Sequence, residues 1–246
     1  MPFYIPVQNA RAFRRLTRYD QINWKDLRAV VDAFHGRIDD WYILPTKVLI
    51  SHPDGGHFVF PIMAMNCLLI DMLSQFYFGN DLSPTELKDP KNKLKNPVGG
   101  GTLESSGAKF RDFLVDRLKH LTGPLAIPIK QPITRKNSKP TLDTFQDVLW
   151  GFRCGIMHQA ATPLYALISG IPTVFEFRTR GVTTYADGTP CPAVVYFPQK
   201  LFNELENAFN KYLDDLLNPD PALNDLRRRF KDKFEDSFGV TISATV

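Results

Sequence analysis

The chain has 246 residues, 43% of them hydrophobic, so it can bury a sizeable core in one large domain or two small ones. Charged residues make up 23% of the sequence, a share that excludes wholesale disorder. The formal net charge of +4 permits a polyanionic partner without requiring one.

Cysteine spacing and hydropathy indicate the cellular compartment in which the protein is expected. Cys67, Cys154 and Cys191 form no CxxC pair and match no metal-ligand spacing, so we expect no disulfide framework and no metal site. The N-terminal residues lack the continuous apolar run of a signal peptide. The most hydrophobic segment, residues 58–79, is interrupted by polar residues such as Asp71, which argues against a membrane span. We therefore expect a cytoplasmic protein without membrane contact.

The first half of the chain predicts helices. Apolar residues recur at helical spacing from residue 23 to residue 50, with an interruption expected at Pro45. A second helix is expected to open near Pro61 and to end before Gly79. Residues 80–106 are rich in Pro, Gly, Lys and Asn and predict a long surface loop, after which 107–121 predicts a short amphipathic helix.

The second half predicts a loop over 122–140 and then a long helix over 141–168 with Thr141 as its N-cap. Within residues 173–198, two β-branched and aromatic runs (173–178 and 193–197) flank a turn over 179–192, which predicts an antiparallel hairpin. Two further helices are expected over 199–238. The expected fold is a single, mainly α domain over 1–246, with a small β-hairpin inserted late.

The helix expected over 141–168 is apolar on two faces. One stripe, which includes Phe145, Leu149 and Phe152, is expected to face the core. The opposite side carries Trp150, Cys154, Met157, His158 and Ala161, so we expect another helix of the chain or another subunit to cover it as well. The small residues Gly151, Cys154, Gly155 and Ala161 leave room for a second backbone or for a ligand beside His158.

Arg153 and His158 are unusual residues for so apolar a segment. They lie about 140° apart around an ideal helix, so they are not simple neighbours, although a long arginine side chain can bend toward the histidine. One alternative is structural: Arg153 pairs with a buried carboxylate and His158 is a hydrogen-bonded core or interface histidine. The other is that both belong to a functional site. The spacing alone favours the structural alternative.

The run RCGIMH (153–158) resembles the Arg-x4–6-His signature of the HEPN superfamily, as found in a bacterial branch of that superfamily. The resemblance covers residues 24–168, of which only 153–158 is diagnostic. It implies a HEPN-like helical bundle and a homodimer in which two motif helices form a composite cleft. Many HEPN proteins are metal-independent endoribonucleases of defence or stress-response systems. In many of these nucleases Asn, Asp or His follows the arginine, whereas here it is Cys154.

Metal-free RNA cleavage needs an acid/base group and a cation for the charge that develops on phosphorus. The resemblance implies that His158 supplies the first and Arg153 the second, without any cofactor. Gln159 is expected to help line the cleft. A buried carboxylate at Asp71 needs a cationic or hydrogen-bonding partner, for which Arg153 is the candidate. Asp71 would then either orient a catalytic arginine or neutralise a structural one.

Basic segments are the expected contacts with RNA phosphates: Lys130, Arg135, Lys136 and Lys139 in one loop, and the run Arg227–Arg229. An ordinary solvated surface is the alternative for each. The first hypothesis is a HEPN-like homodimeric endoribonuclease with RNA as its substrate and an antitoxin or regulatory protein as a further partner. The alternative is a non-catalytic HEPN-like module that binds nucleotide, RNA or protein.

Overall fold

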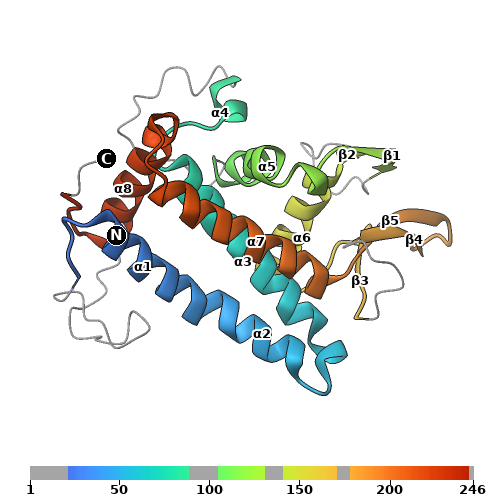
Figure 1. Cartoon of the computed structure of the whole chain (residues 1–246). Coiled ribbons are helices and arrows are strands. Elements are labelled where there is room, and N and C mark those ends of the chain that lie inside the picture. The colour runs from blue at the N-terminus through green and yellow to red at the C-terminus, as the bar shows by residue number, and fades with distance from the viewer. Residues whose placement is uncertain (1–21, 89–104, 131–140, 171–177, 244–246) are drawn as a thin grey trace. The chain divides into compact units, whose positions relative to one another are not determined.

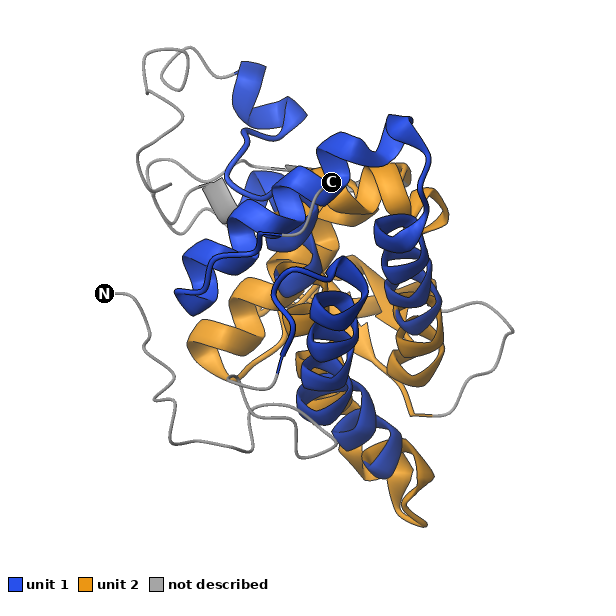
Figure 2. Ribbon diagram, turned by 60° about the vertical axis from the view of Figure 1, so that its left-hand side comes forward, with its two compact units in different colours: residues 1–48, 72–109, 206–246 blue, residues 49–71, 110–205 orange. Residues whose placement is uncertain are grey.

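Helices dominate the structure, as the hydrophobic periodicity predicts (Figure 1). This computed structural model describes residues 22–88, 105–130, 141–170 and 178–243. The described elements belong to two compact units, shown in blue and orange in Figure 2. Unit 1 comprises residues 1–48, 72–109 and 206–246, and unit 2 comprises residues 49–71 and 110–205. Residues 24–168, expected to form one helical core, contribute to both units.

The N-terminal helical segment is interrupted, as Pro45 predicts. Helix α1 (Leu27–Ile38) begins at Asp26, whose side chain accepts a hydrogen bond from the backbone N–H of Arg28. A π-helical turn (Asp39–Ile43) separates α1 from α2 (Leu44–Ser51), with Pro45 in the first turn of α2. Proline has no N–H to donate in that turn, so the regular hydrogen-bond ladder is broken there.

Unit 1 has an aromatic core. Phe34 of α1 is fully buried, and its ring lies 4.6 Å from that of Phe76 in α3 (Val59–Phe78). The other rings around it come from α7 (Pro198–Leu217) and α8 (Asn224–Phe238), namely Phe209, Phe230 and Phe234. Helix α7 begins 120 residues after α3 ends, so these ring contacts hold together segments of unit 1 that are far apart in the sequence. Within the expected loop 80–106, residues Pro84–Lys88 form the short helix α4.

Unit 2 contains two small sheets beside its helices. Strands β1 (Pro124–Lys130) and β2 (Thr141–Thr144) pair antiparallel. In the second sheet, β5 (Pro190–Tyr196) lies between β4 (Arg178–Thr184), which is antiparallel to it, and β3 (Ala166–Ile168), which is parallel. The β4–β5 pair confirms an antiparallel hairpin within 173–198, but most of β4 consists of residues expected in the turn. Residues 173–177, expected in the first strand, lie outside the described part of the chain.

The helix expected over 141–168 is shorter than predicted. Helix α6 spans Phe145–Gln159, so Thr144 rather than Thr141 is its N-cap, and residues 166–168 form β3. Ala160 takes a left-handed conformation with φ of 49°, and Pro163 follows three residues later. Proline cannot continue a helix, so the chain reverses after α6. The loop expected over 122–140 is also wrong in part, because its first residues form β1.

One apolar stretch, Gly55–Phe78, has the length and mean hydropathy (1.6) of a membrane span. The core helix of a soluble protein passes the same test. In this stretch Asn66 is fully buried and donates a hydrogen bond to the carbonyl oxygen of Pro198 at 2.9 Å, within unit 2. Cys67 and Ile70 are also fully buried. These features fit a core helix that packs against protein.

Candidate functional site

Helix α6 carries the candidate site, and its two ends are both fixed by local contacts. At the start, the Thr144 hydroxyl accepts a hydrogen bond from the Asp147 N–H at 3.3 Å and donates one to the Asp147 carboxylate at 2.5 Å. At the end, the N–H of Ala160 is bonded to carbonyls of the last turn. His158 therefore lies in the final turn of a capped helix, next to the chain reversal.

The small residues of α6 accommodate the returning chain. A Cβ atom added to Gly155 would lie 2.7 Å from the carbonyl oxygen of Ala161 and 3.0 Å from Cδ of Pro163. One added to Gly151 would lie 2.4 Å from the hydroxyl of Tyr165. At Gly155 the close neighbours include a backbone atom of the chain itself, whereas at Gly151 the close neighbour is the side chain of Tyr165.

The second apolar face of α6 is covered over its first half. The Trp150 ring lies 5.3 Å from that of Phe110 in α5 (Ser105–Arg117), also within unit 2. This confirms the expectation that another helix of the chain covers this face at Trp150. The last turn is different, because Met157 is 44% exposed and His158 and Gln159 are exposed too. The uncovered part of the face is therefore the part that carries His158.

Arg153 pairs with Asp71, as expected from the buried carboxylate. The Arg153 Nη2 atom lies 2.8 Å from Oδ2 of Asp71, and the two side chains are only 15% and 19% exposed. A charge-assisted hydrogen bond in such a partly buried position fixes the guanidinium group. The same group lies 5.1 Å from the ring centroid of Trp150, within the range of a cation–π contact.

Arg153 also reaches His158, in spite of their separation around the helix. The Arg153 Nη1 atom lies 3.5 Å from Nε2 of His158, a long hydrogen bond. A guanidinium group can only donate, so Nε2 must accept, and the proton of a neutral imidazole is then on Nδ1. Asp71, Arg153 and His158 therefore form a row in which the arginine contacts both of the others.

The thiols near this row are protonated at neutral pH. Burial raises the pKa of Cys154 above its usual value, although Arg153 and Arg111 oppose that shift. Burial raises the pKa of Cys67 to about 12, again with Arg153 opposing. A thiol at such a site is a poor nucleophile. Cys154 therefore acts as a small packing residue beside the arginine.

Gln159 is next to His158 in the exposed last turn, and no hydrogen bond of its side chain to another described residue is present. In the described part of the chain no three His, Cys, Asp or Glu side chains are grouped to hold a metal ion. The row of Asp71, Arg153 and His158 thus offers an imidazole and a guanidinium at one surface. These groups suit acid/base and phosphate chemistry.

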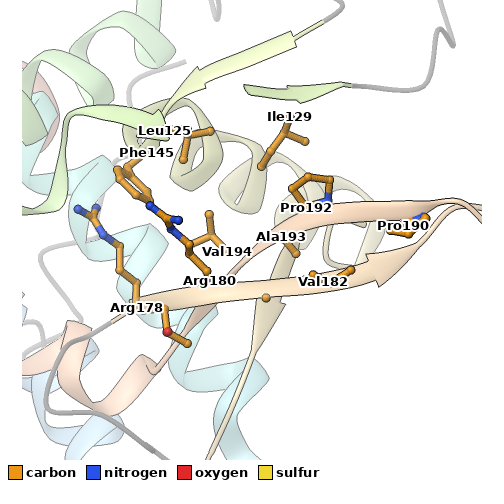
Figure 3. Close-up of a pocket in the computed structure, with 12 residues that line it drawn as sticks. Leu125, Ile129, Phe145, Arg178, Arg180, Val182, Pro190, Pro192, Ala193 and Val194 are labelled. Carbon is orange, nitrogen blue, oxygen red and sulfur yellow. The ribbon is translucent and has the colours of Figure 1, made fainter. Parts of the chain in front are cut away.

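A second feature was not singled out from the sequence. Arg178 and Arg180 line a cavity of about 690 Å³ in unit 2, between the β4–β5 hairpin and β1 (Figure 3). The two arginines are at alternate positions of a strand, so their side chains project from the same face of the sheet. Arg178 is the last residue of the run predicted as a strand and Arg180 lies in the stretch predicted as a turn, so no strand spacing in the sequence paired them.

The basic segments give no evidence of a phosphate-binding surface. Arg135, Lys136 and Lys139 lie outside the described residues, as does the side chain of Lys130. In the run Arg227–Arg229, Arg227 is 4% exposed and donates to the carbonyl oxygens of Asn218 and Asp220.

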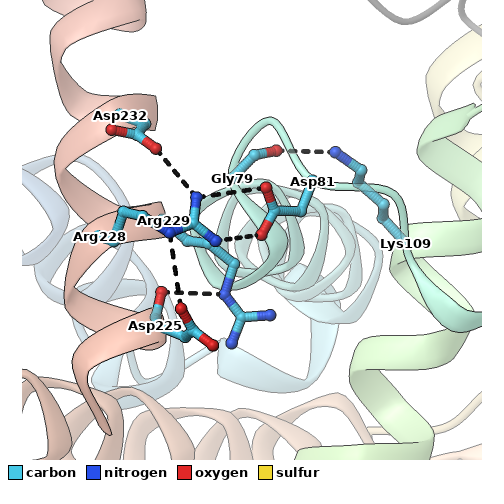
Figure 4. Close-up of polar contacts among 7 residues, drawn as sticks. All are labelled: Gly79, Asp81, Lys109, Asp225, Arg228, Arg229 and Asp232. Carbon is cyan, nitrogen blue, oxygen red and sulfur yellow. Dashed lines mark hydrogen bonds and ion pairs between the residues drawn. The ribbon is translucent and has the colours of Figure 1, made fainter. Parts of the chain in front are cut away.

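The other two arginines of that run also have partners within unit 1. Arg228 pairs with Asp81 at 2.6 Å and with Asp232 at 3.2 Å (Figure 4). Arg229 donates from Nε to the carbonyl oxygen of Asp225 at 3.2 Å. The run therefore serves contacts within the chain.

Comparisons with protein-family models, with curated proteins and with solved structures give no match. A functional assignment therefore depends on the residues and contacts of this chain.

The Asp71–Arg153 pair is expected to be energetically coupled. Asp71→Asn or Arg153→Met alone leaves a partly buried charge without its counter-charge, and each should lower the free energy of unfolding by about 1–3 kcal/mol. The double variant should lose less than the sum of the two, with a coupling of about 1 kcal/mol or more. Urea unfolding of the four proteins measures this, and additive losses would contradict the pairing.

Gly155→Ala tests whether the chain reversal needs a glycine on α6. Alanine favours a helix interior by about 1 kcal/mol over glycine. We expect overpacking against Ala161 and Pro163 to outweigh that gain, with a net loss of about 1–3 kcal/mol in urea unfolding. Gly56→Ala is the matched control in the same unit, because an added Cβ there meets nothing within 4 Å. Equal stability of the two variants would contradict the close approach.

Proposed function

We propose that the protein is a metal-independent endoribonuclease of the HEPN type, with His158 as its acid/base and Arg153 as the cation that binds phosphate. The single observation that carries the proposal is the 3.5 Å contact between Arg153 and His158 on a helix where the two positions point about 140° apart. An arginine that only neutralised Asp71 would not need to reach the imidazole. The contact puts an imidazole and a guanidinium where one phosphodiester can meet both.

The chemistry is an attack of the RNA 2′-OH on the adjacent phosphorus. The attack forms a 2′,3′-cyclic phosphate and expels the 5′-oxygen of the next nucleotide. A neutral His158 accepts the 2′-OH proton on Nε2, the nitrogen with the lone pair, and the protonated ring then protonates the leaving oxygen. To do so it must exchange its contact with Arg153 for one with the substrate. The released Nη1 donor of Arg153 is then available to a phosphate oxygen.

Asp71 positions Arg153 in this scheme. Its hydrogen bond holds Nη2 at 2.8 Å and leaves Nη1 directed to His158. The carboxylate also reduces the net positive charge of the site, so phosphate binding by one copy is weakened. A second copy that placed its own last turn of α6 opposite would add a second Arg153 and His158. The exposed Met157 beside His158 supplies apolar surface for such a homodimer. RNA as the substrate fits a cytoplasmic location.

A non-catalytic HEPN-like module is the second candidate. The observation that favours it is the low exposure of Arg153, 15%, together with its pairing to Asp71. In this alternative the row of Asp71, Arg153 and His158 organises a surface that binds RNA, a nucleotide or a regulatory protein. It differs from the first candidate in one measurable respect, because it predicts binding without cleavage.

Cleavage of a mixed-sequence RNA in the presence of EDTA separates the two candidates. We expect the wild type to cut, and His158→Ala to lower kcat by about 100-fold or more because the acid/base group is lost. Arg153→Lys should also be impaired, because an ammonium cannot reproduce the planar fork. His57→Ala is the matched control, since His57 is an exposed histidine of the same unit outside the row.

A chemically modified RNA substrate gives a second readout. A 2′-deoxy substitution at the nucleotide before the cut should abolish cleavage there, because the nucleophile is missing. A wild type that is inert on broad RNA substrates, or a His158→Ala variant as active as the wild type, would refute the nuclease proposal. RNA binding without cleavage, lost in Arg153→Lys, would establish the second candidate.

A further inference from the structure

The cavity beside β4 has two chemically distinct ends. Arg178 and Arg180 extend from β4 toward Phe145 at the start of α6, away from Pro190 (Figure 3). Arg178 stacks over the Phe145 ring, 3.4 Å from its centroid, and donates a hydrogen bond to the carbonyl oxygen of Leu121 at 3.0 Å. Its guanidinium is therefore fixed at one end of the cavity. None of these residues belongs to the row of Asp71, Arg153 and His158.

The described residues that line the cavity include no acidic side chain. In the part of the chain that the structure describes, Arg180 has no ion-pair partner. The Cα atoms of residues two apart in a strand are separated by roughly 7 Å, so two arginines on one face bring like charges near each other, and such charges repel. An anion bound between Arg178 and Arg180 removes that repulsion. The arrangement thus favours a ligand with a negatively charged head.

The remaining wall is aliphatic. Val182, on the same face of β4 as the arginines, is joined by Ile129 of β1 and by Pro190, Pro192 and Ala193 of β5. Among the described lining residues only Thr179 has a hydroxyl group, and its position in β4 alternates with those of the arginines, so it projects from the opposite face. A nucleobase is read through hydrogen bonds to its edges or by stacking on open aromatic faces. Here Arg178 already covers the Phe145 face that it stacks on, and the aliphatic wall fits a hydrocarbon chain better than a base.

We propose that this cavity binds an aliphatic anion, with a carboxylate or phosphate head between Arg178 and Arg180 and a hydrocarbon chain along the Val182–Pro192 wall. The volume of about 690 Å³ is within the range of cavities that take small-molecule ligands. The site is independent of the proposed RNA cleavage, and its test does not require that activity. Free fatty acids and alkyl phosphates share this chemistry.

Calorimetric titration of the full chain tests the proposal with octanoate, decanoate, decyl phosphate and decan-1-ol, all below micelle formation. Each added methylene should tighten binding by up to about fourfold, the factor for a fully buried CH₂, because Val182 is 71% exposed and the wall covers the chain only in part. Decanol should bind about 10- to 100-fold more weakly than decanoate, because it lacks the charge that the arginines meet. Whichever of decanoate and decyl phosphate binds more tightly identifies the head group, and either order supports the proposal.

Arg180→Gln should weaken decanoate by about 10- to 100-fold and leave decanol unchanged. Lys119→Gln is the matched control, because it removes the same charge from an exposed position of unit 2 outside the cavity. The proposal is overturned if decanoate does not bind, if chain length has no effect, or if the two variants bind decanoate equally. Displacement of decanoate by a short single-stranded RNA, lost in Arg180→Gln, would assign the arginines to RNA and overturn it too.

Discussion

The Asp71–Arg153 ion pair is the constraint on which the candidate site depends. It joins residues 82 positions apart, and both side chains are mostly buried, so removing either charge lowers the stability of the fold. By fixing Nη2 of Arg153, the carboxylate determines where the rest of the guanidinium lies, and Nη1 then meets His158. The ion pair holds the arginine in a position to bind phosphate, and it also reduces the net positive charge of the site. The first effect favours a nuclease and the second a non-catalytic binding module, so these are the two candidates.

The chain reversal after α6 explains why His158 is accessible when Arg153 is not. Gly151 and Gly155 let Tyr165 and Pro163 pack against the helix, while the last turn stays open to solvent. Cys154 between these two glycines is half-buried, and its raised pKa keeps it a thiol. A larger residue at either glycine would push the returning strand β3 away from α6. The packing of the reversal and the exposure of the imidazole are thus consequences of the same small residues.

Helical periodicity predicts α1, α5, α7 and α8, because each has an apolar stripe that recurs every turn or two. Helix α3 is apolar nearly all round, and Pro61 in its first turn and Gly79 after its last residue predict its ends. The strands were harder. β3 has three residues and pairs with β5 almost thirty positions later, so its partner is not visible locally. Pro163 marked the end of α6 and was overlooked in an apolar run. The Asp71–Arg153 pair followed from the need of a buried carboxylate for a cation, whereas the cavity at Arg178 and Arg180 required the tertiary arrangement of two sheets.

The proton position on the His158 ring tests the central claim most directly. Arg153 donates to Nε2 of His158, so the neutral ring carries its proton on Nδ1. Nitrogen-15 NMR of the imidazole, at a pH where the ring is neutral, distinguishes the two tautomers. We predict the Nδ1–H form in the wild type and a loss of that preference in Arg153→Met. An Nε2–H form in the wild type, or the same spectrum in both proteins, would contradict the account.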